Sequence, residues 1–184
     1  MTQIDLLQSV EELEKHYNAP SKLSRYKSRG MLTTAMQKWL SFSPFFIVST
    51  CGTHGLDCSP RGDEAGKAFR ILDAHTIAFP DRRGNNRIDS LRNMIVDPRI
   101  GLLFFVPGVS EALRIKGEAV ISVAPDLLTL FEQDGLTPAT VIVISINEVY
   151  IQNARAIRSS GLWEIANSTD VAAIPDAAQL SKDD

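Results

Sequence analysis

Cysteine and histidine are scarce, since the 184 residues include only two cysteines and three histidines. Cys51 and Cys58 cannot form the disulfide framework of a small secreted domain, and neither stands at a metal-binding spacing from a histidine. The sequence therefore predicts no metal site, and we expect both cysteines to be small buried hydrophobic side chains. The N-terminus is polar and acidic, and no segment approaches the roughly 18 consecutive apolar residues of a membrane helix. We therefore expect a soluble cytoplasmic protein with no membrane partner.

A net positive charge is also lacking, because 22 acidic side chains outnumber 19 basic ones and the formal charge is −3. No positive field exists to attract nucleic acid, and the aromatic residues lie mostly in apolar runs rather than between basic residues. A nucleic-acid-binding barrel is thus disfavoured, and any anion must be bound by local groups. The sequence contains no Gly-x-Ser-x-Gly, His-Glu-x-x-His or Walker motif, so it offers no candidate catalytic side chain.

Short apolar segments separated by turn residues dominate the chain from residue 45 onward. The predicted strands are 45–51, 56–60, 68–72, 76–79, 100–106, 113–123 and 141–146. They cluster as hairpins and do not alternate with helices, which favours antiparallel pairing over a parallel sheet. We expect a mainly β (α+β) fold, namely a six-stranded closed antiparallel barrel with flanking helices, in one domain of ordinary size.

Short helices are expected around this barrel. One follows a capping box formed by Ser9 and Glu12, and the others are expected at 33–40, from Asn85-Asn86 to Asp97-Pro98, and at 125–133. The helix that starts at Asn85-Asn86 would be held by Ile88, Leu91 and Ile95, which follow helical spacing. The segment 153–163 is expected to be the last ordered part of the chain. We divide the chain into an N-terminal helical segment packed on the barrel (1–43), the barrel itself (44–165) and a polar C-terminal tail (166–184).

Two of the predicted strands, 100–106 and 141–146, are almost unbroken apolar runs. Such runs need cover on both faces of the sheet. The interior of a barrel covers one face, and a partner subunit can cover the other. We therefore expect a homodimer.

Four arginines, at positions 82, 83, 87 and 92, fall within eleven residues where a strand turns into a helix. The unpaired backbone amides of a helix start and the fork-shaped donors of guanidinium groups together favour a phosphate site. The alternative is a solvated arginine loop, and we assign that role to Arg82, Arg83 and Arg92. Arg87, beside the expected helix cap, is the candidate phosphate ligand.

The segment 57–63, Asp-Cys-Ser-Pro-Arg-Gly-Asp, contains the second candidate. Ser59 and Arg61 stand at the end of a hairpin strand, Pro60 stiffens the backbone between them, and Gly62 permits the close approach of a ligand. A plain turn with an Arg–Asp ion pair accounts for the same residues. The pattern alone does not decide between the two.

Seven sequence blocks occur in an order and spacing that are specific. They are SPFFIVST, THG, SPRGD, FPDRRGNNRIDSLRN, DPRIGLLFFVPG, LRIKGEA and RAIRSSGLW. From about Glu11 to Trp163 the chain resembles the pyridoxamine 5′-phosphate oxidase-like flavin-binding family, and within it a bacterial subgroup of mostly unassigned reaction. The resemblance implies a split β-barrel that binds flavin mononucleotide (FMN) at the subunit interface of a homodimer.

The resemblance also implies roles for individual residues. Ser59-Pro60-Arg61 and Asn85-Asn86-Arg87 would hold the FMN phosphate, while Phe79-Pro80 and Asp63 would lie beside the flavin ring and ribityl chain. A catalytic side chain is not required, because the flavin ring itself carries the hydride transfer.

The closing block resembles a family segment that lies near the flavin from the other subunit. Arg155, Arg158 and Trp163 are therefore candidates for the substrate or second-subunit side of the flavin, and Trp163 either flanks the ring or fills a core. Asn153 stands where close relatives carry cysteine, and Arg155 stands where they carry lysine. The Arg-x-His substrate motif of the vitamer oxidase is absent, so pyridoxamine phosphate is not the expected substrate.

The implied function is an FMN-dependent oxidoreductase that moves a hydride between the flavin and a small substrate or reduced nicotinamide. The alternative is a protein that binds a flavin, a deazaflavin or heme without turnover. Both uses need the same phosphate anchor, and the sequence leaves the substrate open.

Overall fold

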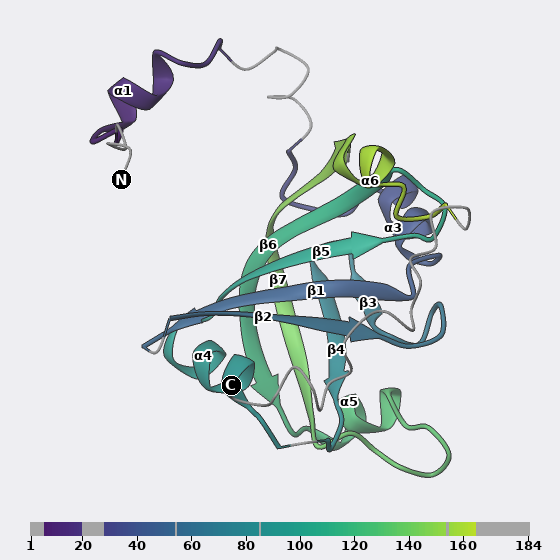
Figure 1. Ribbon diagram of the computed structural model, residues 1–184. Coiled ribbons are helices and arrows are strands. Elements are labelled where there is room, and N and C mark those ends of the chain that lie inside the picture. The colour runs from purple at the N-terminus through teal and green to yellow at the C-terminus, as the bar shows by residue number, and fades with distance from the viewer. Residues whose placement is uncertain (1–5, 20–27, 54, 85, 154, 165–184) are drawn as a thin grey trace, which may run out of the picture.

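The computed structural model describes residues 6–19, 28–53, 55–84, 86–153 and 155–164 (Figure 1). Its strands are β1 (Phe45–Gly52), β2 (Gly55–Gly62), β3 (Arg70–Asp73), β4 (Thr76–Asp81), β5 (Arg99–Phe105), β6 (Glu111–Ser122) and β7 (Thr140–Asn153). Its helices are α1 (Val10–Glu14), α3 (Thr34–Leu40), α4 (Asp89–Val96), α5 (Pro125–Leu130) and α6 (Arg155–Ser160). None of the helices in these ranges has the length and apolar character that a membrane span requires.

The strands form one antiparallel sheet in the order β2-β1-β5-β6-β7-β4-β3. The predicted mainly β, antiparallel class with flanking helices is confirmed, with two corrections. The sheet has seven strands rather than six, because all seven predicted segments pair in it, including the four-residue β3 at the edge beside β4. The strand ladder is also not closed, since its order ends at β2 and β3. Pro60 lies in β2 and lacks a backbone N–H, which suits this strand to an edge.

The sheet curls around a core of phenylalanine rings. Phe46 of β1 stacks on Phe104 of β5 with 4.9 Å between the ring centroids, and it meets Phe79 of β4 edge-on at 5.3 Å. Three strands separate β1 from β4 in the sheet order, so only a curled sheet brings these rings together. In Figure 1, β1, β2 and β5 accordingly pass in front of β4 and β7. The fold is a barrel that is split between β2 and the β4–β3 hairpin.

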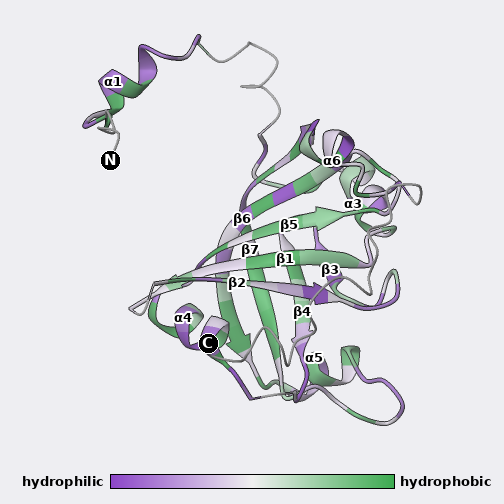
Figure 2. Ribbon diagram, viewed as in Figure 1, coloured by the Kyte–Doolittle hydropathy of each residue, from purple (hydrophilic) through white to green (hydrophobic). Residues whose placement is uncertain are grey.

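Alternation along each strand decides which side chains enter this core. On β6, Leu113, Ile115 and Ala119 are buried, whereas Arg114 and Lys116 between them are exposed. Figure 2 shows that β7 is largely hydrophobic along its length, while the edge strand β2 is mostly hydrophilic. The most polar strand of the sheet, β2, is therefore an edge strand, and it lies beside the split of the barrel.

The segment before the barrel contributes to the core through α3. Leu32 and Leu40, at the two ends of this helix, are fully buried in the main hydrophobic cluster. Before α3, Arg29 forms a backbone bridge with Val149 of β7. In α1, Ser9 accepts a hydrogen bond from the backbone N–H of a residue three positions on, as the capping box predicts, and no residue of that helix is buried. The predicted tail, 166–184, lies outside the described residues.

The start of α4 differs from the expected cap. The helix begins at Asp89 with Ile88 as its N-cap residue, and no side chain caps it. Asn86 does not cap the helix, because its φ of +58° places it in the left-handed region, where it turns the chain ahead of the helix. Asn85 lies outside the described residues.

The packing of α4 also differs in part from the expectation. Leu91 packs on the core as predicted, and Met94 and Asn93 are buried beside it. Ile88 and Ile95 are 40% and 74% exposed, so the prediction that they hold the helix is wrong. The buried face of the helix runs through residues 90, 93 and 94, which lie on one side at helical spacing.

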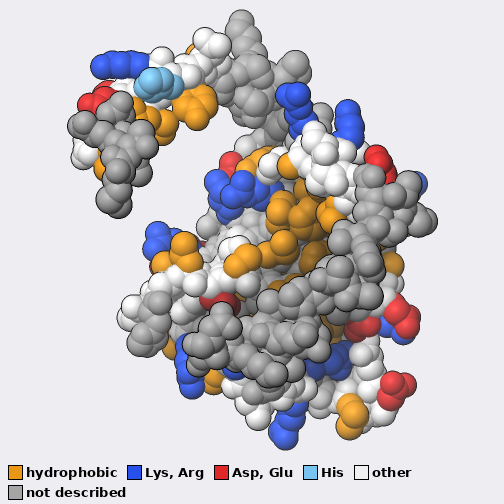
Figure 3. All heavy atoms as spheres, viewed as in Figure 1, with side chains coloured by type: hydrophobic (Ala, Val, Ile, Leu, Met, Phe, Trp, Pro, Cys, Tyr) orange, Lys and Arg blue, Asp and Glu red, His pale blue; other side chains and the backbone are white. Residues whose placement is uncertain are grey.

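The outer face of β1, β2 and β5 carries apolar side chains that this chain covers only in part. Phe45 and Leu56 are 37% and 87% exposed, and Leu103 and Phe105 are half-buried. Figure 3 shows hydrophobic side chains gathered on the face of the molecule that these strands form. This face is the largest apolar area visible in that view.

The two cysteines lie on this same outer face, and the expectation that both are buried is wrong. Cys51 is half-buried and Cys58 is exposed. Cys51 stands three residues after the buried Val48 and therefore on the opposite side of β1. Cys58 pairs with Ser49, whose side chain is also exposed.

The β6–β7 ladder contains a bulge after Lys116, at which Asn147 is the extra residue. Gly117 follows and is buried between the two strands. A Cβ atom at this position would collide with the carbonyl oxygen of Ser145 and would lie 2.9 Å from the side chain of Ile144. Only glycine fits the close approach of the two backbones at this point.

Candidate functional site

Two neighbouring pockets lie along the edge strand β2. The first, which we name the α4 pocket, has a volume of about 370 Å³ and is lined by Asp57, Ser59, Pro60, Arg61, Arg87, Asp89 and Ser90. The second, the β4 pocket, has a volume of about 260 Å³ and is lined by Pro60, Arg61, Gly62, Asp63, Ala68, Phe79, Pro80 and Arg82. Pro60 and Arg61 line both, so the two pockets meet at Arg61.

Most of the predicted cofactor residues line these pockets. Ser59 and Arg87 line the α4 pocket, Asp63, Phe79 and Pro80 line the β4 pocket, and Pro60 and Arg61 line both. Asn86 is exposed next to Arg87 in the chain, and Asn85 is not among the described residues. The fold thus gathers residues from β2, β4 and the start of α4 at the split of the barrel.

The polar lining of the α4 pocket follows from the alternation of side chains along β2, in which every second residue faces the same side. Asp57, Ser59 and Arg61 alternate along the strand and are half-buried. Ser59 and Arg61 pair with Val48 and Phe46 of β1, whose side chains point into the barrel. Since paired residues of neighbouring strands point to the same face, the polar side chains of β2 also face inward, toward α4 and the split.

Arg61 forms the contact that crosses the split. Its Nη1 lies 2.9 Å from Oδ1 of Asp81 at the end of β4, and the two side chains are 27% and 17% exposed. Its guanidinium carbon lies 5.9 Å from the centroid of the Phe79 ring. The ion pair matches the plain Arg–Asp alternative of the sequence analysis, but Nε of Arg61 is buried and has no hydrogen-bond partner among the described residues. A buried N–H donor without an acceptor is costly, which indicates an acceptor supplied by a ligand.

Ser59 belongs to a chain of hydroxyl contacts that ends on a carboxylate. Its Oγ lies 3.3 Å from Oγ of the buried Ser90 in the first turn of α4, and the Ser90 hydroxyl donates to Asp57. Sequence reasoning gives neither Asp57 nor Ser90 as a site residue. The one available signal is that Asp57 stands two positions before Ser59 and so on the same face of β2.

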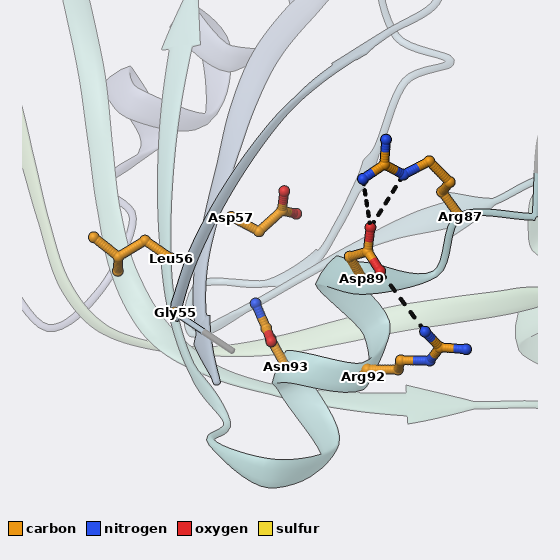
Figure 4. A pocket seen from close by; sticks show the side chains of 7 residues that line it. All are labelled: Gly55, Leu56, Asp57, Arg87, Asp89, Arg92 and Asn93. Atoms are coloured by element: carbon orange, nitrogen blue, oxygen red, sulfur yellow. Dashed lines mark hydrogen bonds and ion pairs between the residues drawn. The ribbon is translucent and has the colours of Figure 1, made fainter. Parts of the chain in front are cut away.

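Arg87 lines the α4 pocket and is 80% exposed. It also lines a neighbouring pocket of about 290 Å³, which Figure 4 shows with its lining residues Gly55, Leu56, Asp57, Arg87, Asp89, Arg92 and Asn93. Nε and Nη2 of Arg87 both lie 3.2 Å from Oδ2 of Asp89, whose other oxygen is 3.8 Å from Arg92. Exposed pairs of this kind contribute only about 0–1 kcal/mol, so a bound anion can compete for the guanidinium. Arg92 lines the pocket of Figure 4 and does not line the α4 pocket, although the two pockets share Asp57, Arg87 and Asp89.

Asp63 in the β4 pocket is held by fixed donors. Its Oδ2 accepts a hydrogen bond of 3.0 Å from Nε2 of Gln133, and its Oδ1 accepts one of 2.8 Å from the backbone N–H of Glu64. The bond from Gln133 lowers the pKa of Asp63 below its ordinary value, and the backbone N–H and the nearby charges of Arg82 and Lys67 act in the same direction. Asp63 is therefore an ionised acceptor beside the pocket.

The three predicted residues of the closing block lie elsewhere on this chain. Arg155 and Arg158 are exposed on α6, at the end of the sheet away from α4 (Figure 1). Trp163 donates from Nε1 to the carbonyl oxygen of Val109 at 3.0 Å and packs beside Ile157. Neither arginine nor Trp163 lines the α4 or β4 pocket, and Trp163 fills a small hydrophobic cluster in this chain.

Comparison with models of known protein families identifies the family to which the chain belongs. A family model described as pyridoxamine 5′-phosphate oxidase matches residues 32–153. The chain belongs to the pyridoxamine 5′-phosphate oxidase-like family. The match contains both pockets and ends before α6, and the predicted resemblance is confirmed. A comparison with curated protein sequences gave no match.

Solved structures agree with this pyridoxamine 5′-phosphate oxidase-like fold. HupZ from group A Streptococcus has a TM-score of 0.54 at 18% identity, with 67% of this chain and 96% of HupZ covered. A protein from Lactobacillus delbrueckii that carries the provisional name pyridoxamine 5′-phosphate oxidase has a TM-score of 0.51 at 18% identity, with 67% and 98% covered. Identities this low show a shared fold, and the function must be argued from the site.

Proposed function

We propose that this protein is a cytoplasmic FMN-dependent oxidoreductase that acts on a small substrate or a reduced nicotinamide. The observation that carries the proposal is the α4 pocket, in which Ser59 and Arg61 of β2 meet Arg87 from the start of α4. These residues are 26 to 28 positions apart in the chain, and they converge in a family of flavin-binding proteins. Fork-shaped arginine donors beside a hydroxyl are suited to a terminal phosphate.

The residues of the site fit FMN. Arg61 has a buried Nε donor that needs an acceptor, and the α4 pocket beside it is open to an anion that Arg87 can reach. Ser59, Arg61 and Arg87 would hold the phosphate, with Asn86 next to Arg87 in the chain. Pro60, Asp63, Phe79 and Pro80 would line the ribityl chain and ring in the β4 pocket. When bound, FMN supplies the hydride-transfer chemistry, and the chain supplies position and polar contacts.

The protein is expected to be yellow as purified and to release FMN rather than FAD. The proposed anchor serves one terminal phosphate, and the sequence has no Gly-x-Gly-x-x-Gly loop for a dinucleotide. The absorption spectrum of freshly purified protein shows whether a flavin is bound. Chromatography of the chromophore released on denaturation then distinguishes FMN from FAD. A colourless protein that also fails to take up added FMN would contradict the proposal.

The alternative to an enzyme is a carrier that binds the flavin without catalytic turnover. Mixing the FMN-loaded protein with reduced nicotinamides under anaerobic conditions distinguishes the two, because an oxidoreductase bleaches the flavin absorbance at a rate that saturates with donor. The carrier alternative also includes deazaflavin or heme as the ligand, which the released chromophore identifies.

We also propose that the protein is a homodimer with FMN at the subunit interface. The partly covered apolar face of β1, β2 and β5 supports this, since Leu56 on it is 87% exposed. In this arrangement we place the exposed Arg155 and Arg158 near the flavin of the partner subunit, whereas Trp163 packs in the cluster of its own chain. We expect light scattering to give the dimer mass at micromolar concentration. A monomer that retains flavin would refute the dimer.

A further inference from the structure

A further hollow lies beside the β4 pocket. It has a volume of about 650 Å³ and is lined by Arg82, Arg83 and the connection from Gln133 to Ala139. Arg82 lines both this hollow and the β4 pocket, so the two share a wall. We name this space the 133–139 hollow.

The connection that forms the hollow is anchored along its length. Phe131 at its start is 2% exposed and packs in a cluster with α5 and β7. Gln133 donates to Asp63, and the backbone N–H of Ala139 donates to the carbonyl oxygen of Asp81 at 2.9 Å. Gln133 and Leu136 exchange two further backbone bonds of 2.8 and 3.0 Å. The hollow is therefore preorganised, so a ligand would not have to order the connection on binding.

The charge of the hollow differs from that of the α4 pocket. Arg61 and Arg87 each form an ion pair with a carboxylate. Arg82, by contrast, donates from Nη2 to the neutral carbonyl oxygen of Phe131 at 2.9 Å, which fixes the guanidinium, and the carboxylate of Asp63 acts on it through a longer-range electrostatic interaction. Within the described ranges, neither Arg82 nor Arg83 forms an ion pair with a carboxylate.

Besides these two guanidinium groups, one carboxylate, that of Asp134, lines the hollow. The residues that line the hollow thus carry two positive charges and one negative charge, and the carboxylate of Asp63 lies in the adjoining β4 pocket. Paired arginines with donors to spare are suited to phosphate oxygens, which accept fork-shaped hydrogen bonds. The assignment of Arg82 and Arg83 as simply solvated does not account for this placement.

We propose that the 133–139 hollow is the subsite for the phosphate groups of a phosphate-bearing substrate, with Arg82 and Arg83 as its ligands. This inference rests on the proposed function, because it places the flavin ring in the adjoining β4 pocket. A substrate whose reacting end lies over the ring would then reach the hollow past Arg82 with its anionic group. The substrate class is accordingly anionic and phosphate-containing, as in a reduced dinucleotide.

The test is a calorimetric titration of the full-length protein, with and without added FMN, using ADP-ribose and inorganic pyrophosphate as probes. We expect Arg83→Ala to weaken ADP-ribose binding about 10-fold, the loss that a charge-assisted contact of ~1.4 kcal/mol produces. Arg82→Lys keeps the charge, loses the fork and should show a smaller loss. Arg99→Ala is the matched control, because Arg99 is 78% exposed, paired with Asp97 and outside the hollow.

Adenosine, which lacks phosphate, should bind far more weakly than ADP-ribose and should not respond to Arg83→Ala. Pyrophosphate should respond as ADP-ribose does when FMN fills the α4 pocket. An Arg83→Ala protein that binds both phosphate probes like the wild type would overturn the subsite, as would an equal loss in Arg99→Ala. FMN affinity should be unchanged in Arg83→Ala and Arg99→Ala, because neither Arg83 nor Arg99 lines the α4 or β4 pocket. A protein that binds no FMN refutes the proposed function separately, whatever the probes show.

Discussion

Replacing Arg87 with alanine is expected to weaken FMN binding by ~30-fold to ~1000-fold, a loss of roughly 2–4 kcal/mol. The reason is the loss of charge-assisted hydrogen bonds to the phosphate in the α4 pocket. The ion pair with Asp89 does not offset this much, because Arg87 is 80% exposed and such pairs are worth about 0–1 kcal/mol. Quenching of flavin fluorescence on titration gives the dissociation constant directly.

Riboflavin and Arg92→Ala are the controls for this prediction. Riboflavin has the same ring without phosphate, so its weaker binding should be nearly the same in wild type and Arg87→Ala. Arg92 contacts the same Asp89 at 3.8 Å but does not line the α4 pocket, so Arg92→Ala should affect neither ligand much. The fold should survive, because α4 is held by Leu91 and Met94. If Arg87→Ala binds both ligands like the wild type, or weakens both equally, the phosphate lies elsewhere.

Gly117→Ala is expected to lower the free energy of unfolding by about 3 kcal/mol, the upper part of the range for overpacked cores. The new methyl group would meet the Ser145 carbonyl oxygen, which the β6–β7 ladder holds in place, and the side chain of Ile144 at 2.9 Å. Because backbone rather than a flexible side chain blocks the space, relief requires the ladder to shift. Urea unfolding followed by circular dichroism measures the loss.

Gly101→Ala provides the matched comparison on the neighbouring strand. Gly101 pairs with Lys116, one residue from Gly117, but a Cβ there would lie 3.8 Å from the nearest atom, the Cβ of Ser49. That is an ordinary van der Waals distance, so this variant should be unchanged or more stable by about 0.4–1 kcal/mol through the entropy of the unfolded chain. Equal stabilities for the two variants would show that the bulge at Gly117 is not tight.

The local parts of the fold follow from the sequence. The alternation in β1, the tight turn after Gly52 and the polar return of β2 predict the first hairpin, and the structure confirms it. Leu91 on α4 packs where helical spacing puts it. The sequence predicts a strand at 68–72, but the six-strand count for the barrel is too low, because β3 joins the sheet as an edge strand beside β4.

The parts of the site that sequence reasoning missed depend on the curl of the sheet. Ser90 reaches Asp57 across 33 positions and Gln133 reaches Asp63 across 70, and no local pattern encodes either contact. The exposed position of Cys58 has the same origin, because the edge position of β2 decides what covers it. Which strands lie at the edges depends on the strand order of the whole sheet, and no single segment of the sequence determines it.

The Arg61–Asp81 ion pair joins β2 to β4 where no backbone ladder does. Six pairs of neighbouring strands are joined by rows of backbone hydrogen bonds, each row rigid because its bonds must break together. Across the split, by contrast, the described part of the chain is joined by side-chain contacts, among them this ion pair and the hydrogen bond from Gln133 to Asp63. The wall is therefore held by no row of backbone hydrogen bonds along this line, which both pockets adjoin. A molecule bound across it would add a cross-link between two edges that the ladder leaves unjoined.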